Sequence, residues 1–342
     1  MRLIGGLSQI VLTVAVSALL LPAVSMAQER SVGRVVVFGT SLSDPGNAFA
    51  VFSDPTAFGV DQSCDFDAPA NTPPYDSLDD FLVPVSSYAK GGHHFSNGAT
   101  WIEQFALGTH FAGNVQPALR SAALVASNYA VGGARAADFA CRYNFNAQLS
   151  AYLADSPVTS ADTLIVIEIG SNDVRDALVG VTAGQDPSAV IGAALGNIQH
   201  TIQVLYGQGA RKFLLVNAPN IGATPAVRMI DNAFGGQGMV IAAANGLAVA
   251  FNMGLASVQH GLNAGLPGID IKLLDLYALL NEVLETPGAF SIGNTVDACV
   301  TPGVAPYQCE FPDTYLFWDG VHPTKAVHGI VARKAAELVL TE

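Results

Sequence analysis

Five short apolar runs, the first four of which end in a turn of glycine or small polar residues, constrain the fold of this chain most. The clearest run is 163–169, which continues into Gly170-Ser171-Asn172-Asp173. Strands that are apolar throughout, without polar alternation, are typical of a parallel sheet covered on both faces. The sequence predicts such strands over residues 34–38, 127–131, 163–169, 212–216 and 269–274.

Helical segments separate most of these strands. They are predicted over residues 101–107, 187–206, 239–262, 276–284 and 326–340. Alternating strands and helices indicate a doubly wound α/β domain. No internal repeat, linker or low-complexity tract marks a second domain, so we expect a single domain over residues 28–342.

The first 27 residues have the features of a signal peptide. Arg2 is followed by an apolar stretch from about Ile10 to Val24, and Ser25 and Ala27 are the small residues that precede a cleavage site. We expect export to the periplasm or the extracellular space with cleavage after Ala27. No later stretch predicts a transmembrane segment.

Composition limits the classes of molecule that this chain is expected to bind. Only 13% of the 342 residues are charged, and the formal net charge is -13. Binding to nucleic acid or to an anionic membrane requires Lys and Arg, so both are disfavoured. A neutral or zwitterionic small molecule is the expected substrate, and the sequence leaves the oligomeric state open.

Four cysteines in an exported chain point to disulfides. Cys299 and Cys309 bracket a short loop rich in Pro and Gly and form the first expected pair, which leaves Cys64 with Cys141. Zinc is the alternative. No C-x-x-C motif or suitably spaced histidine supports it, and neither a metal nor a cofactor is expected.

Residues 52–98 form a long irregular insertion. The stretch is interrupted by Pro73-Pro74, Pro84 and Gly91-Gly92. Long irregular segments inside a domain are usually functional, for example as a wall or lid over a site. Its acidic residues lack the spacing of a calcium loop, so we interpret them as a solvated surface.

The first three strands end in groups suited to attack on a carbonyl. Ser41 follows the first strand, Gly132-Gly133 the second and Asn172 the third. Ligands bind at the carboxyl ends of strands in open α/β sheets, so these groups should face one crevice. They supply a hydroxyl, close backbone approach and an amide donor. Taken alone, Ser41 is more simply a helix cap.

A nucleophilic serine needs a base. His322 stands out among seven histidines because Asp319 precedes it by three residues, with Gly320 closing the turn. Asp319 can therefore bond one imidazole nitrogen while the other faces Ser41. His93 and His94 lie in a Gly-rich loop, and the other four histidines lack an acidic partner at a useful spacing. We assign all six to the surface or to packing.

Taken in order, these segments closely resemble the four blocks of the SGNH or GDSL superfamily of serine hydrolases. They read 38-FGTSLSDPGN-47, 128-NYAVGGA-134, 169-IGSND-173 and 319-DGVHP-323. The resemblance spans residues 35–324. It implies a three-layer α/β/α sandwich with a mainly parallel five-stranded sheet of the flavodoxin-like kind.

The resemblance also assigns roles. Ser41 is the expected nucleophile, His322 the general base and Asp319 its orienting carboxylate. The Ser41 N–H, the Gly133 N–H and the Asn172 amide would form the oxyanion hole, with Gly132 one residue away as the alternative to Gly133. The chain departs from the family at Thr40, where an Asp is usual.

The expected function is hydrolysis of carboxylic esters through an acyl-enzyme on Ser41. Residues 92–101 and the turn after Val216 resemble a branch of phospholipases, lecithinases and hemolysins, so acyl lipids are the first substrate class. A polysaccharide O-acetyl esterase or an acyltransferase would use the same site. A non-catalytic binding module is the alternative outside enzymes.

Overall fold

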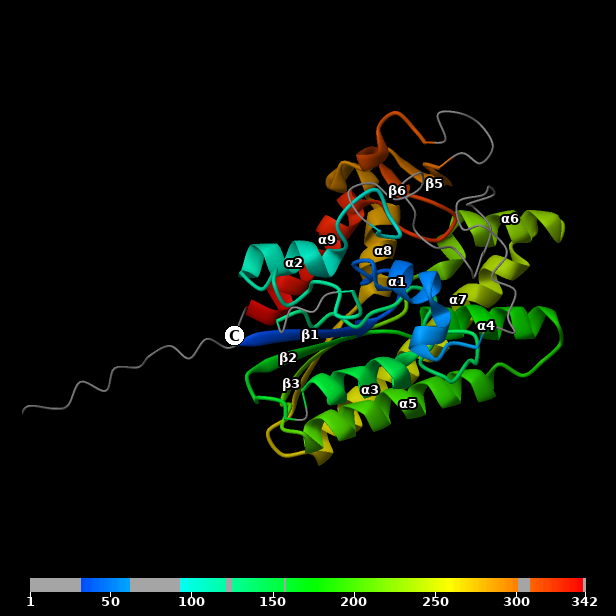
Figure 1. The fold of residues 1–342 in the computed structure, drawn as a ribbon. Helices are drawn as coiled ribbons and strands as arrows, with labels where there is room; N and C mark the ends of the chain where they lie inside the picture. Colours follow the sequence, from blue (N-terminus) through cyan, green and yellow to red (C-terminus); the bar gives the residue numbers. More distant parts are fainter. Residues whose placement is uncertain (1–31, 62–92, 121–124, 157, 301–307, 341–342) are drawn as a thin grey trace, which may run out of the picture. The chain divides into compact units, whose positions relative to one another are not determined.

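The computed structural model describes residues 32–61, 93–120, 125–156, 158–300 and 308–340, all within one compact unit that begins at Val32 (Figure 1). The signal-peptide prediction, Cys64 and most of the predicted insertion lie outside these residues. Of the insertion, the described part comprises the end of α1 (Asn47–Ser53), the 3₁₀ turn η1 (Pro55–Phe58) and residues 59–61 and 93–98.

Four parallel strands form the main sheet in the order β1-β2-β3-β4. They are β1 (Arg34–Gly39), β2 (Thr163–Glu168), β3 (Lys212–Val216) and β4 (Asp270–Leu274). Gly39 pairs with Glu168, and Glu168 pairs with Val216, so the carboxyl ends of the strands are level. Each of these strands lies within a residue or two of its predicted range.

The remaining predicted strand, 127–131, runs parallel to β1 along its free edge. The N–H groups of Tyr129 and Val131 donate to the carbonyls of Val37 and Gly39, yet the segment forms only isolated bridges at Asn128. Side chains replace the rest of the ladder, since the Asn47 amide donates to the carbonyls of residues 128 and 130. The five parallel segments have the predicted flavodoxin-like arrangement, with the fifth irregular.

Helices cover both faces of the sheet, which confirms the predicted α/β/α sandwich (Figure 1). One face packs against α3 (Phe145–Asp155), α4 (Ser171–Thr182), α5 (Ser188–Gly207) and α7 (Met239–Gly265), and the other against α2 (Trp101–Thr109), α8 (Leu276–Glu285) and α9 (Lys325–Leu340). Alternate residues of β1 point to opposite cores. Val36 and Phe38 join the first, and Val35 and Val37 the second.

The sequence prediction missed several elements. Helix α4 begins directly after β2 because Gly170 takes a left-handed φ of 116°, which turns the chain at once from strand to helix. Helix α6 (Pro225–Ala233) begins with a proline, and Thr224 caps it by accepting the Val227 N–H. The other missed elements are α1, α3, the paired strands β5 (Asn294–Ala298) and β6 (Tyr315–Phe317), and the 3₁₀ turns η1, η2 (Ile221–Ala223), η3 (Pro287–Phe290) and η4 (Pro312–Thr314).

The Cys299–Cys309 disulfide is present, which confirms that predicted pair. Helix α7 is long and apolar enough to cross a membrane by length and composition alone. Residues such as Ala244, Phe251 and Leu255 on α7 are buried in the core of the sandwich, and core helices pass the same test. That the chain lacks a transmembrane segment therefore stays a prediction.

Candidate active site

Ser41 lies two residues beyond the end of β1, in a turn closed by the Ser43 N–H donating to the Thr40 carbonyl. From β1 the chain leads to the 127–131 segment on one side of the strand, and β2 lies on the other. A crevice opens at such a switch point in strand order, so the fold itself places the Ser41 hydroxyl at a ligand-binding position. The flanking Thr40 and Ser43 are fully buried, while Ser41 is half-buried.

The structure brings His322 and Asp319 to Ser41 across 281 residues of sequence. His322 Nε2 lies 2.8 Å from Ser41 Oγ, and His322 Nδ1 lies 2.6 Å from Asp319 Oδ2. The other oxygen, Asp319 Oδ1, accepts the backbone N–H groups of Val321 and His322 at 2.8 and 2.5 Å. A carboxylate held in this way keeps the proton on Nδ1 and leaves Nε2 free to accept one.

Two glycines, Gly132 and Gly133, follow the 127–131 segment and differ in their surroundings. The Gly132 N–H already donates to Asp44 Oδ2 at 2.8 Å, and a Cβ on Gly132 would lie 2.2 Å from the Phe95 ring. Gly133 takes a left-handed φ of 78°. Because the Gly132 N–H already donates to Asp44, Gly133 stays the candidate of the two for donating to a negative oxygen.

Asn172 lies in the first turn of helix α4, just after the carboxyl end of β2, and lines the pocket that contains Ser41. Its Nδ2 donates one hydrogen to the Ala134 carbonyl at 2.9 Å. An amide nitrogen carries two hydrogens, so the second is available to a ligand. This bond also ties the Asn172 side chain to the turn that contains Gly133.

Two buried aspartates hold these turns together. Asp44 accepts N–H groups from Gly46, Asn47, Ala48 and Gly132 and so joins the Ser41 turn to the glycine turn. Burial raises the pKa of Asp44 to about 6, and the four N–H donors act in the opposite direction. In the same way, burial raises the pKa of Asp173 to about 6, and Asp173 accepts two N–H groups of the chain after Ala134.

Sequence reasoning missed Glu168, the last residue of β2. Its carboxylate accepts the N–H and hydroxyl of Thr40 and the hydroxyl of Ser43, at 3.0 to 3.2 Å. Burial raises the pKa of Glu168 to about 7. The available signal was an acidic residue inside an otherwise apolar strand, which costs free energy unless its carboxyl is hydrogen-bonded.

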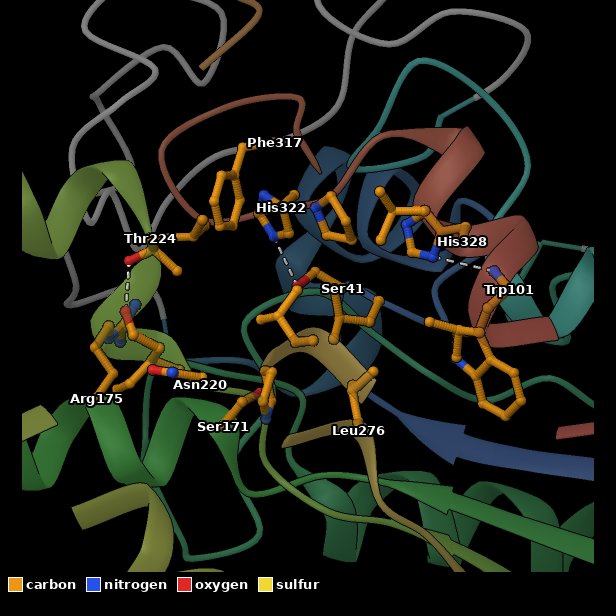
Figure 2. Close-up of a pocket in the computed structure, with 18 of the residues that line it drawn as sticks. Ser41, Trp101, Ser171, Arg175, Asn220, Thr224, Leu276, Phe317, His322 and His328 are labelled. Atoms are coloured by element: carbon orange, nitrogen blue, oxygen red, sulfur yellow. Dashed lines mark hydrogen bonds between the residues drawn. The ribbon is translucent and has the colours of Figure 1, made fainter. Parts of the chain in front are cut away.

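A cavity of about 110 Å³ opens beside Ser41 (Figure 2). In this view Trp101, Leu276 and His328 lie on one side of Ser41, and Arg175, Asn220 and Thr224 on the other. The lining also includes apolar residues of two helices, Leu276 and Leu280 of α8 and Val327 and Val331 of α9. Pockets of this kind, apolar with a few polar groups, are typical of small-molecule sites.

His328 lines this pocket, and its burial agrees with the assignment of the other six histidines to the surface or to packing. His328 is 2% exposed, and its Nδ1 accepts the backbone N–H of Trp101 at 3.2 Å. Burial, together with the nearby His322 and His94, lowers the pKa of His328 to about 3, so its ring is neutral. Within the described parts of the chain, no group of three or more His, Cys, Asp or Glu side chains could hold a metal ion.

Comparison with known proteins gives one family. The model of the GDSL-like Lipase/Acylhydrolase family matches residues 35–335. Among curated proteins, the chain is 28% identical to GDSL esterase/lipase At2g04570 of Arabidopsis thaliana over 187 residues, 51% of this chain and 53% of that protein. It is 28% identical to GDSL esterase/lipase EXL4 of the same plant over 193 residues, 54% of each chain. These matches cover about half the length of each relative.

Proposed function

We propose that this chain, which belongs to the GDSL-like lipase/acylhydrolase family, is an exported serine esterase of a single catalytic domain that hydrolyses carboxylic esters through an acyl-enzyme on Ser41. The observation that carries the proposal is the unbroken chain from Ser41 Oγ through the His322 ring to Asp319, at 2.8 and 2.6 Å. A hydroxyl bonded to an oriented imidazole is the arrangement that activates a serine.

Each group has a defined task in the proposed reaction. Ser41 Oγ attacks the ester carbonyl carbon while His322 Nε2 takes its proton, and the carbonyl oxygen becomes negative. The N–H groups of Ser41 and Gly133 and the Asn172 amide stabilise that oxygen. The protonated His322 then gives its proton to the leaving alcohol. Water attacks the acyl-enzyme by the same steps and releases the acid.

The pocket supports an acyl lipid as the substrate class. Its apolar lining residues from α8 and α9 can bury the methylene groups of an acyl chain, each of which contributes about 0.8 kcal/mol when removed from water. The polar side near Arg175 and Asn220 suits the alcohol part of the ester. The likeness of residues 92–101 to the phospholipase and hemolysin branch agrees with this choice. Export is supported by the Cys299–Cys309 disulfide, since disulfides persist in oxidising compartments.

The nucleophile is tested by labelling with a fluorophosphonate and by turnover of p-nitrophenyl esters. Wild type should label on Ser41, and Ser41→Ala should lose labelling and turnover to background while keeping the melting temperature. Ser150→Ala, on the exposed side of α3, is the matched control and should behave as wild type. Equal turnover by folded Ser41→Ala would exclude Ser41, and a wild type that neither labels nor hydrolyses any ester would favour a binding module.

The substrate class is tested with esters of increasing acyl length. Val331→Phe should slow octanoate esters more than acetate esters because Val331 lines the apolar side of the pocket. Lys334→Phe, on the same helix but exposed, is the control. A marked preference of wild type for acetate would support a polysaccharide O-acetyl esterase instead, and ester products formed with an added alcohol would reveal an acyltransferase.

A further inference from the structure

The buried carboxylate of Glu168 reaches the Ser41 turn from the neighbouring strand. Glu168 ends β2 and pairs in register with Gly39 on β1. A Cβ on Gly39 would lie 2.8 Å from the Glu168 carbonyl and 3.2 Å from its Oε2. A glycine at residue 39 therefore leaves the space through which the Glu168 side chain passes to the turn.

The carboxylate bonds the residues on both sides of the nucleophile. Oε2 accepts the Thr40 N–H at 3.2 Å, and Thr40 Oγ1 donates to the carboxylate at 3.1 Å. Ser43 Oγ donates to Oε2 at 3.0 Å. Because Thr40 and Ser43 both donate to one buried carboxylate, these hydrogen bonds restrain the Ser41 backbone between them.

The same network continues into the wall of the pocket. Ser43 Oγ accepts the Trp101 indole N–H at 3.0 Å, and Trp101 lines the cavity beside Ser41. Figure 2 shows the Trp101 side chain on the side of Ser41 toward β1. Displacing the Glu168 carboxylate would therefore disturb the nucleophile and one wall of the pocket together.

Glu168 is 3% exposed, and within the described residues its partners are these hydrogen-bond donors and no cation. A buried carboxyl without a counterion costs folding free energy, and such costs concentrate where they serve function. Thr40 occupies the place where an Asp is usual in the family, and in this chain the Thr40 hydroxyl donates to the Glu168 carboxylate.

We propose that Glu168 is a positioning residue for Ser41, which holds the nucleophile and its oxyanion-binding N–H through Thr40 and Ser43. The inference rests on the proposed esterase function. It assigns the carboxylate missing at residue 40 to the end of β2, and it requires residues 40 and 168 to be interdependent.

The test is a reciprocal exchange of the carboxylate. Glu168→Gln should lower kcat for a p-nitrophenyl ester by about tenfold or more with KM within about twofold, since the positioning acts on the transition state. Thr40→Asp alone should be at least as harmful because it places two buried carboxyls together. The double variant Thr40→Asp/Glu168→Gln should recover to within about threefold of wild type, because residues in one network are non-additive.

Two conservative substitutions of Thr40 test the same hydrogen bonds in case the Glu168 variants misfold. Thr40→Val removes only the hydroxyl donor and should lower kcat by about five- to tenfold, while Thr40→Ser keeps the donor and should stay within about twofold. Folded Glu168→Gln with wild-type kcat would overturn the inference. So would equal harm from Thr40→Asp with and without Glu168→Gln, or equal kcat for the valine and serine variants.

A second readout does not depend on turnover. Amide hydrogen exchange of residues 40–43 should speed up in Glu168→Gln and return toward the wild-type rate in the double variant. A wild type that hydrolyses no ester would refute the esterase proposal. Unchanged amide exchange at residues 40–43 in Glu168→Gln would refute the positioning role of Glu168. The two failures are therefore distinguishable.

Discussion

Replacing Asp319 with Asn should invert the hydrogen-bonding of the His322 imidazole, the proposed general base. Asp319 Oδ1 accepts two backbone N–H groups, from Val321 and His322, so in the variant the amide oxygen must occupy that place. The amide NH₂ then faces His322 Nδ1, which has to become the acceptor. The ring proton moves to Nε2, the atom 2.8 Å from Ser41 Oγ, and Nε2 can no longer take the proton of Ser41.

The expected loss is large because the wrong tautomer disables the base while every hydrogen bond is kept. A serine–histidine–aspartate site treated in this way loses kcat by about 10⁴. That loss corresponds to about 5 kcal/mol of barrier. Since Asp319 is fully buried and its replacement has almost the same shape, the melting temperature should change little.

The assay is p-nitrophenyl ester hydrolysis with parallel measurement of the fluorophosphonate labelling rate, which should fall together with kcat. Asp186→Asn serves as the control, because Asp186 is exposed and far from Asp319 in the sequence. A folded Asp319→Asn protein that kept more than about a tenth of the wild-type kcat would refute the reasoning, because the tautomer argument predicts a loss of several orders of magnitude.

Four further predictions concern other positions in the chain. Asn172→Ala should reduce kcat by about 10² to 10³ through loss of an oxyanion donor, and an effect under about threefold would contradict that role. Gly170→Ala should destabilise the fold by more than about 2 kcal/mol in urea unfolding, because φ is 116° and a Cβ would lie 2.1 Å from the Phe251 ring; a neutral result would contradict the close contact. Cys299→Ser should lower the free energy of unfolding by about 3 kcal/mol, by the chain-entropy relation for a disulfide loop of this length. An unchanged urea midpoint would argue against a stabilising disulfide. The pKa of Glu168 rises on folding from 4.5 to about 7, so its protonated form is favoured in the folded state; relative to Glu168→Gln, wild type should lose up to about 3 kcal/mol of unfolding free energy as pH rises from about 4.5 through 7, and a gain would reverse the sign.

Sequence patterns predicted the architecture well because the responsible interactions are local. Fully apolar strands and amphipathic helices carry their own periodicity, and the Asp319-to-His322 spacing closes a single turn. The strand 127–131 is the exception, since side chains from distant parts of the sequence complete its hydrogen bonds. Its regularity depends on neighbours that periodicity does not reveal.

The sequence alone determined which groups follow which strands, and so which hydroxyl, glycines, amide and histidine were candidates for one crevice. Only the tertiary structure decided the distances between them, because strand register and helix packing bring residues 41 and 322 within 2.8 Å. The tertiary structure also decided which residues support the Ser41 turn and which line the pocket. Glu168 meets Thr40 through pairing of β1 with β2, and His328 reaches the pocket through packing of α9 against α2. Neither contact has a signature in local spacing, since each joins residues more than one hundred positions apart in the sequence.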